Sequence, residues 1–464
     1  MSPSSTERLL PVHVKSAGGP VRITLLDHGY RPVGDPQVSE FTSEAPPGLY
    51  LLQYDTGWFS RQEMIELEPG GQGYTDLDLR VPFPSAAPIP GTSGYRPAQA
   101  EAARALSLAP QARLGSGARL MLFVRTLKDG APAPSLAALS LRGPDLEPLV
   151  EPLPSDRASA ADGWAGWCAD VAPGFYVLRW KGDGDSLPAV DQALWAAAGW
   201  TTILFLTSRD DGKAPHPHDL TVHLAATGAG FLPGENDAEK EEAVGTQLAL
   251  ELALAGWRTG KALVDPSSLD RLLAGNFANP MLGVVAAHVL LEGPAPDAAV
   301  LTPLLDTLEA PGMLPDCPDV RALRGMVRRR FRLRETVPLL DWPPMFKASF
   351  RGAIAGDWDG HGLISAGSLA DRVAPCLVAL SPWTTWLPLT GASTPAGPLP
   401  ADGSGAEADF LGGWLRDVFT DLGMAERIVR ELGLDWRHTP PADVWRQILA
   451  SPDPTVGKLA AQVQ

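Results

Sequence analysis

The sequence predicts an α+β multidomain protein in which two small antiparallel β-sandwiches are followed by an all-helical C-terminal half. Two observations predict this order. The phrase APPGLYLLQY at residues 45–54 recurs as VAPGFYVLRW at residues 171–180, and beyond residue 235 the hydrophobic period changes from strand-like to helical. A Pro-Gly turn before an apolar-aromatic-apolar run is typical of a turn followed by a half-buried strand.

The similarity extends to both sides of this phrase in unchanged order. Every matched segment alternates apolar and polar residues over a short run, which indicates strands. Residues 8–14 match 119–125, 23–33 match 139–149, 64–67 match 202–206, and 75–81 match 218–224. We therefore predict a tandem duplication, with one sandwich over residues 1–82, a Pro/Ala-rich linker over 83–117, and a second sandwich with insertions over 118–230.

The repeated Pro-Gly phrase resembles the corresponding strand of the prealbumin-like, carboxypeptidase-regulatory-like and Cna-B-like sandwiches. The resemblance covers each copy separately. In those families the module is usually a binding or spacing domain, so the resemblance implies that neither copy has chemistry of its own.

The second half of the chain is expected to be helical. Asn236 and Asp237 can cap a helix over 238–257, and proline near the start of several later segments suits a first helical turn. Further helices are predicted at 266–274, 280–291, 297–308, 319–333, 344–354 and 366–377, which makes 235–390 an all-helical domain. Residues 391–405, nearly free of large apolar side chains, predict a flexible linker, and 406–464 a small helical module.

The pattern WLRDVFTDLGMAERIVRELGL from Trp414, followed by VWRQIL from Val444, resembles the effector-associated, death-like domains of bacterial conflict systems. The resemblance implies that this module recruits a protein partner, such as a protease or a signalling effector, through like-with-like contacts. A generic helical end cap has the same spacing.

Composition excludes several classes of protein. The net charge of −16 argues against a nucleic-acid groove, and the arginine-rich run at 321–334 is expected to be a helix with its arginines in solvent or paired with acids. No apolar stretch reaches the roughly 18 residues of a membrane span, and the first residues lack the pattern of a signal peptide. Cys168, Cys317 and Cys376 are far apart, which indicates neither a disulfide framework nor a structural zinc site. We expect a cytoplasmic protein without a cofactor.

The densest set of possible metal ligands is HPHDLTVH at residues 216–223. A His-x-His pair on a strand points both rings to one face, as a metal site needs. His218 and His223, however, are an odd number of residues apart, and the matched positions at 75–80 are ordinary strand residues. We therefore predict strand positions here and no metal site.

Two other groups of residues suggest chemistry. Asp357, Asp359 and His361 could act as acid and base or hold a cation, although acidic residues beside glycine also form solvent-exposed turns. Cys168 could pair with a distant histidine as a thiol nucleophile, or be a buried structural cysteine.

Tryptophan is a common energetic anchor of protein interfaces and equally a core residue. The predicted interaction residues are Trp164, Trp167, Trp195 and Trp200 of the second sandwich and Trp383 and Trp386 of the helical domain. We therefore expect a non-catalytic protein-interaction protein, an adaptor, regulator or protease target of a bacterial defence or stress-response complex. The alternative is a hydrolase whose dispersed active site lies in the helical domain, at residues such as Asp357, Asp359 and His361.

Overall fold

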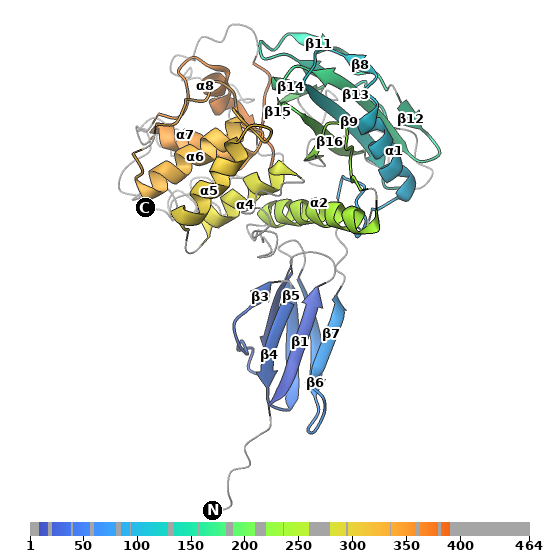
Figure 1. Ribbon diagram of the computed structural model, residues 1–464, viewed down its shortest axis with the longest axis vertical. Coiled ribbons are helices and arrows are strands. Elements are labelled where there is room, and N and C mark those ends of the chain that lie inside the picture. Colours follow the sequence, from blue (N-terminus) through green and yellow to red (C-terminus); the bar gives the residue numbers. More distant parts are fainter. Residues whose placement is uncertain are drawn as a thin grey trace, which may run out of the picture. The chain divides into compact units, whose positions relative to one another are not determined.

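The chain forms two compact units, one made of Met1–Leu141, Pro148–Gly174 and Trp195–Asp316, the other of Arg142–Glu147, Phe175–Leu194 and Cys317–Gln464. Both contain strands and helices, which confirms the α+β class (Figure 1). The computed structural model describes residues 9–16, 21–38, 40–55, 60–79, 85–92, 94–128, 134–155, 157–181, 189–208, 220–234, 236–258, 279–293, 296–334, 336–358, 362–378 and 382–389.

The first strands of unit 1 form two sheets around one core. One sheet has the order β4-β1-β7 and the other the order β3-β2-β5-β6. Alternate residues such as Val12, Ile23 and Leu52 point into the shared core because side chains alternate between the two faces of a strand. The strands are β1 (Leu10–Ser16), β2 (Arg22–Leu26), β3 (Gln37–Val38), β4 (Glu40–Ala45), β5 (Gly48–Asp55), β6 (Ser60–Leu67) and β7 (Tyr74–Leu79).

A larger sheet of unit 1 has the order β12-β13-β9-β16-β17, with β8 paired to β13. A further sheet contains β10 and β11. It also contains β14, β15, β19 and β18, which are neighbours in that order. The bounds are β8 (Ala112–Arg113), β9 (Ala118–Thr126), β10 (Leu139–Arg142), β11 (Pro148–Val150), β12 (Arg157–Ser159), β13 (Trp164–Val171), β14 (Gly174–Trp180), β15 (Val190–Ala196), β16 (Trp200–Ser208), β17 (Leu220–Ala226), β18 (Leu377–Val378) and β19 (Thr385–Trp386).

Strand direction revises how the two halves are paired. β1 is antiparallel to β4 and parallel to β7, and β9 is likewise antiparallel to β13 and parallel to β16. On this topology the counterpart of β7 is β16, whereas the sequence pairing matched residues 75–81 with 218–224, which overlap β17. The strand β17 is then an addition at the edge of the larger sheet. The duplication itself stays a prediction.

The segment expected to be a linker is partly built into unit 1. The helix α1 (Pro97–Leu108) and the residues before it bury Ala87, Ile89, Ala103 and Leu106 in one core with β9, β13 and β16. Ala103 and Leu106 are three residues apart and therefore lie on one helix face. Small side chains that look like a linker by composition here allow a close approach to the sheet.

The helix α2 (Asp237–Arg258) covers the same face of the sheet, where Leu248 and Leu252 join this core. It begins as predicted, because the Asn236 side chain accepts a hydrogen bond from the Glu239 backbone N–H at 3.0 Å. The helices α4 (Pro280–Glu292) and α5 (Ala298–Glu309) also lie in unit 1, and α6 (Pro318–Phe331), α7 (Lys347–Trp358) and α8 (Leu369–Val373) lie in unit 2.

The region expected to be all-helical also contributes the short strands β18 and β19. β19 pairs with β15, where Gln192 lies opposite Thr385, and β18 pairs with β19. The predicted helix at 266–274, the linker at 391–405 and the module at 406–464 lie outside the described residues.

Candidate functional site

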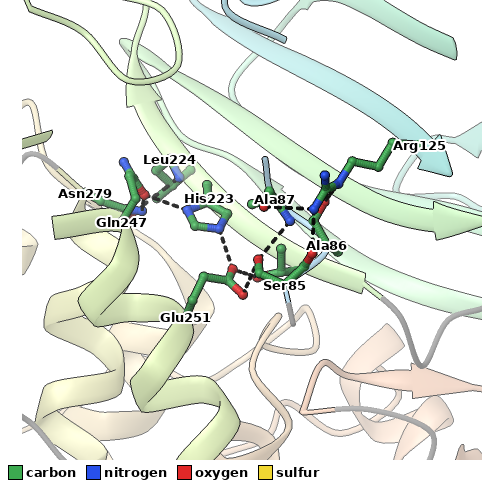
Figure 2. A network of polar contacts seen from close by, with 10 residues as sticks. Ser85, Ala86, Ala87, Arg125, His223, Leu224, Gln247, Glu251 and Asn279 are labelled. Carbon is green, nitrogen blue, oxygen red and sulfur yellow. Dashed lines mark hydrogen bonds and ion pairs between the residues drawn. The ribbon is translucent and has the colours of Figure 1, made fainter. Parts of the chain in front are cut away.

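A chain of buried polar side chains lies between α2 and the sheet of unit 1 (Figure 2). Thr221 and His223 are two residues apart on β17, so they share one face of the strand, and both point toward α2. Gln247 and Glu251 meet them from α2, where residues four apart share a face. Ser85 adds its hydroxyl from the segment before α1. All these side chains are buried.

Both ring nitrogens of His223 have an oxygen partner. Nδ1 lies 2.5 Å from Gln247 Oε1, and Nε2 lies 2.6 Å from Glu251 Oε1. The Glu251 carboxylate also accepts the Thr221 hydroxyl on Oε1 at 2.5 Å and the Ser85 hydroxyl on Oε2 at 2.8 Å. Both oxygens of the Glu251 carboxylate therefore accept a hydrogen bond from within the protein.

Asn279 determines which nitrogen of His223 carries a proton. Its Oδ1 accepts the backbone N–H of Met281 at 3.0 Å, which caps α4, and that of Leu224 at 3.4 Å. The Asn279 amide nitrogen must then donate to Gln247 Oε1, at 2.8 Å. Because this oxygen also faces His223 Nδ1, Nδ1 carries a hydrogen. One further proton lies on the line between His223 Nε2 and Glu251.

The electrostatics favour an ion pair on that line. Burial raises the pKa of Glu251, but the hydrogen bond from His223, the charge of His223 and the hydroxyls of Thr221 and Ser85 together hold it below its ordinary value. We therefore assign a carboxylate to Glu251, which lies 2.6 Å from His223 Nε2. A buried pair of this kind is tolerated when hydrogen bonds satisfy the remaining atoms.

Arg125 binds the segment before α1 to the same sheet through hydrogen bonds. Its guanidinium, fully buried on β9, donates to the backbone carbonyls of Ser85, Ala86, Ala87 and Gly94 and to the side-chain oxygen of Gln99. Burial lowers the pKa of Arg125 to about 9. Four backbone carbonyls, those of Ser85, Ala86, Ala87 and Gly94, thus accept from a guanidinium on the sheet.

This arrangement holds segments together and is not set up for nucleophilic attack. A serine nucleophile needs a base at its hydroxyl, yet the Ser85 hydroxyl donates to Glu251 and not to His223. The reactive atoms are also buried and already partnered within the chain. The network joins Ser85, β17, α2 and the start of α4, four places far apart in the sequence.

Of the other residues singled out by the sequence, Cys168 does not join this site. Cys168 is fully buried on β13, in the core with Ile203 and Phe205. Asp357 lies near the end of α7, and Asp359 and His361 are outside the described residues, so the alternative hydrolase stays a prediction. Residues 209–219, including two of the three histidines of the HPHDLTVH run, are also outside. Within the described ranges, no group of three His, Cys, Asp or Glu residues could hold a metal ion.

The tryptophans fall into two groups. Trp164 and Trp195 are half-buried, and Trp164 stacks on Phe123 with ring centroids 5.3 Å apart. The buried ones are Trp167, Trp200, Trp383 and Trp386. The structure therefore shows these tryptophans packing within the protein. Their role in contacts with a partner protein stays a prediction.

Sequence reasoning missed Ser85, Gln247, Glu251, Asn279 and Arg125. Two signals were present in the sequence. Asn279 directly precedes Pro280, a pairing typical of a helix start. Gln247 and Glu251 are polar residues next to the apolar positions Leu248 and Leu252 of an amphipathic helix.

Among the described residues, no helix is both long and apolar enough to cross a bilayer. No family model and no curated protein matches the sequence. Among solved structures, the TIE protein of Bacillus anthracis aligns at 10% identity over 41% of this chain and 32% of its own length, with a TM-score of 0.16. A candidate cell adhesion protein from Bacteroides fragilis aligns at 12% identity over 44% of this chain and 83% of its own length, with a TM-score of 0.15. This chain thus spans about a third of the Bacillus protein's length, and likenesses at these TM-scores carry no argument.

Proposed function

We propose that this chain is a non-catalytic protein-interaction protein, an adaptor, regulator or protease target of a bacterial defence or stress-response complex. One observation supports this proposal most: the Ser85, His223 and Glu251 side chains, the residue types of a hydrolase, are used to join segments of unit 1. The proposal includes the two-sandwich and helical order of the chain, a cytoplasmic location and a protease or signalling effector as partner.

The buried network suits a scaffold. An enzyme leaves its reactive groups at a cleft that substrate can enter, whereas here the hydroxyl of Ser85 and both nitrogens of His223 are paired and out of solvent. Such pairing holds α2 and residues 85–94 rigidly on the sheet. A rigid surface lowers the entropy lost when a partner binds.

Two measurements on the full chain test the proposal together. The first treats the protein with a fluorophosphonate probe, which modifies activated serines, and maps the modified residues by mass spectrometry. We expect no modification of Ser85. Modification of Ser85 that disappears in His223→Gln would overturn the non-catalytic assignment.

The second measurement isolates partners of the tagged chain from its native host and rebuilds each complex from purified proteins. We expect one stoichiometric binary complex. The Glu251→Ala variant, in which α2 is loosened, should bind that partner more weakly, whereas an exposed change on the same helix, Glu242→Ala, should not. Failure of every candidate to form a complex from pure components would contradict the proposal.

A further inference from the structure

One outer face of the N-terminal sandwich carries a row of apolar side chains. Leu26 of β2 lies directly opposite Leu51 of β5, which lies directly opposite Met64 of β6. Residues opposite each other on neighbouring strands point to the same face, so these three form one row. Leu49 follows on the same face of β5, because Tyr50 and Leu52 point into the core. We call Leu26, Leu49, Leu51 and Met64 the leucine–methionine row.

Two side chains of this row are largely exposed. Met64 is 70% exposed and Leu49 is 56% exposed. The outer face of the other sheet carries polar side chains instead, including the exposed Thr42 and the pair formed by His13 Nε2 and Glu40 at 2.8 Å. An apolar patch bordered by polar residues is typical of a binding surface.

The second copy of the repeated phrase shows how the equivalent positions are covered in the second half of the chain. In it Leu49 corresponds to Phe175 and Leu51 to Val177, and each pair follows a glycine with positive φ at the start of its strand. Phe175 is only 4% exposed, and its ring stacks on Trp342, with centroids 5.3 Å apart and planes 8° apart. In unit 2, a tryptophan from another segment therefore covers the position that Leu49 leaves open.

The size of the row favours one anchoring side chain over a broad contact. Three strands spaced about 4.8 Å apart make the row roughly 10 Å wide, and at the equivalent position in unit 2 a single tryptophan ring stacks on Phe175. A stable interface between two copies needs about 800 Å² on each partner. The row alone is too small for that.

We propose that the leucine–methionine row is a docking surface for a partner protein that presents a tryptophan in an apolar, proline-flanked segment, as Trp342 is presented to Phe175. Trp342 is followed by two prolines and preceded by Leu339, Leu340 and Asp341. The inference rests on the proposed interaction function and names the surface and the chemistry of the partner.

A labelled peptide tests the surface. The probe is a fluorescein-labelled peptide of residues 337–347, VPLLDWPPMFK, titrated with the full chain and followed by fluorescence anisotropy. We expect saturable binding that weakens at least ten-fold in Met64→Glu and in Leu49→Asp, and is lost when Trp342 of the peptide is replaced by alanine. Thr42→Glu places the same charge on the polar face and should leave binding unchanged. No saturable binding, or equal binding by all variants, overturns the proposal.

Methionine oxidation tests whether something already covers the row. With dilute hydrogen peroxide, Met64 of the full chain should oxidise at the rate of a free methionine, while the fully buried Met121 is protected. Protection of Met64 at every protein concentration would show that the chain covers the row itself. Protection that grows with concentration would show that a second copy does. Either result overturns the proposal.

The two proposals can fail separately. If the reconstituted complex of the proposed function forms equally well with Met64→Glu, the row is not its docking surface, but the interaction function stands. If the peptide binds as expected and no native partner forms a complex, the row is a binding surface, and the proposed adaptor role is wrong.

Discussion

Replacing Glu251 by alanine is expected to loosen α2 from β17 and the start of α4. The substitution removes the counter-ion of His223 and the acceptor of the Thr221 and Ser85 hydroxyls. Because all these groups are buried, water cannot replace the lost carboxylate without opening the structure.

The magnitude follows from the contacts. Removing one partner of a buried ion pair costs about 3–5 kcal/mol, and each orphaned hydroxyl adds about 1 kcal/mol. We expect Glu251→Ala to lower the free energy of unfolding of this region by about 5–7 kcal/mol. Glu251→Gln should cost only about 1–2 kcal/mol, because its amide nitrogen can donate to a neutral His223 while its oxygen accepts from Ser85.

The charge of Glu251 also predicts a pH dependence. Its pKa in the folded protein is lowered from the ordinary 4.5, so the carboxylate stabilises the folded state above pH 4.5. This contribution is lost as the pH falls through the lowered folded pKa. The stability difference between wild type and Glu251→Gln should therefore shrink in acid.

Hydrogen exchange is the suitable assay, because a chain of two units need not unfold in one step. Opening free energies are read from amides of α2 and β17 in the full chain, for wild type, Glu251→Ala, Glu251→Gln and the exposed control Glu242→Ala. The control should stay within about 0.5 kcal/mol of wild type. If Glu251→Ala behaves like the control, the network does not hold α2 on the sheet and the reasoning is refuted.

Three further outcomes are expected. Arg125→Lys should lower the free energy of unfolding by about 3 kcal/mol, because one ammonium group cannot reach all the carbonyls that Arg125 contacts. Unchanged hydrogen exchange of the backbone amides near Ser85 and Gly94 would show that these hydrogen bonds of Arg125 are not needed. Asn279→Asp keeps the cap of α4 but loses the donor to Gln247, and should cost about 2 kcal/mol; a thermal melt identical to wild type would contradict the assigned amide orientation. Burial raises the pKa of Asp319 to about 6 from the ordinary 3.8, so the folded state keeps this proton to a higher pH than the unfolded chain does. The stability of unit 2 should accordingly fall as the pH rises from about 4 to 6, and Asp319→Asn should remove that slope from the exchange of α7 amides.

Local patterns predicted most of the secondary structure. The helices expected at 238–257, 280–291 and 297–308 occur as Asp237–Arg258, Pro280–Glu292 and Ala298–Glu309. Their starts are encoded by neighbouring residues, for instance the Asn236 cap, and do not depend on distant parts of the chain. The α+β class follows from the same periodicities.

The candidate site was much less accessible to such reasoning. His223 was noticed as a possible metal ligand, but its partner Glu251 lies 28 residues away. Ser85 is 166 residues from Glu251 in the chain, in a segment whose composition favoured a linker. A local sequence pattern does not predict that these residues are in contact.

Periodicity along the chain encodes which side of a strand or helix is buried, because that depends only on the spacing of apolar residues. It therefore placed Leu49 and Phe175 at equivalent positions of two similar strands. Whether such a face is covered depends on a segment elsewhere in the chain, and the folded arrangement covers Phe175 with Trp342 while leaving Leu49 exposed. The choice of partner is a long-range property, because packing and hydrogen bonds are made in space and not along the sequence.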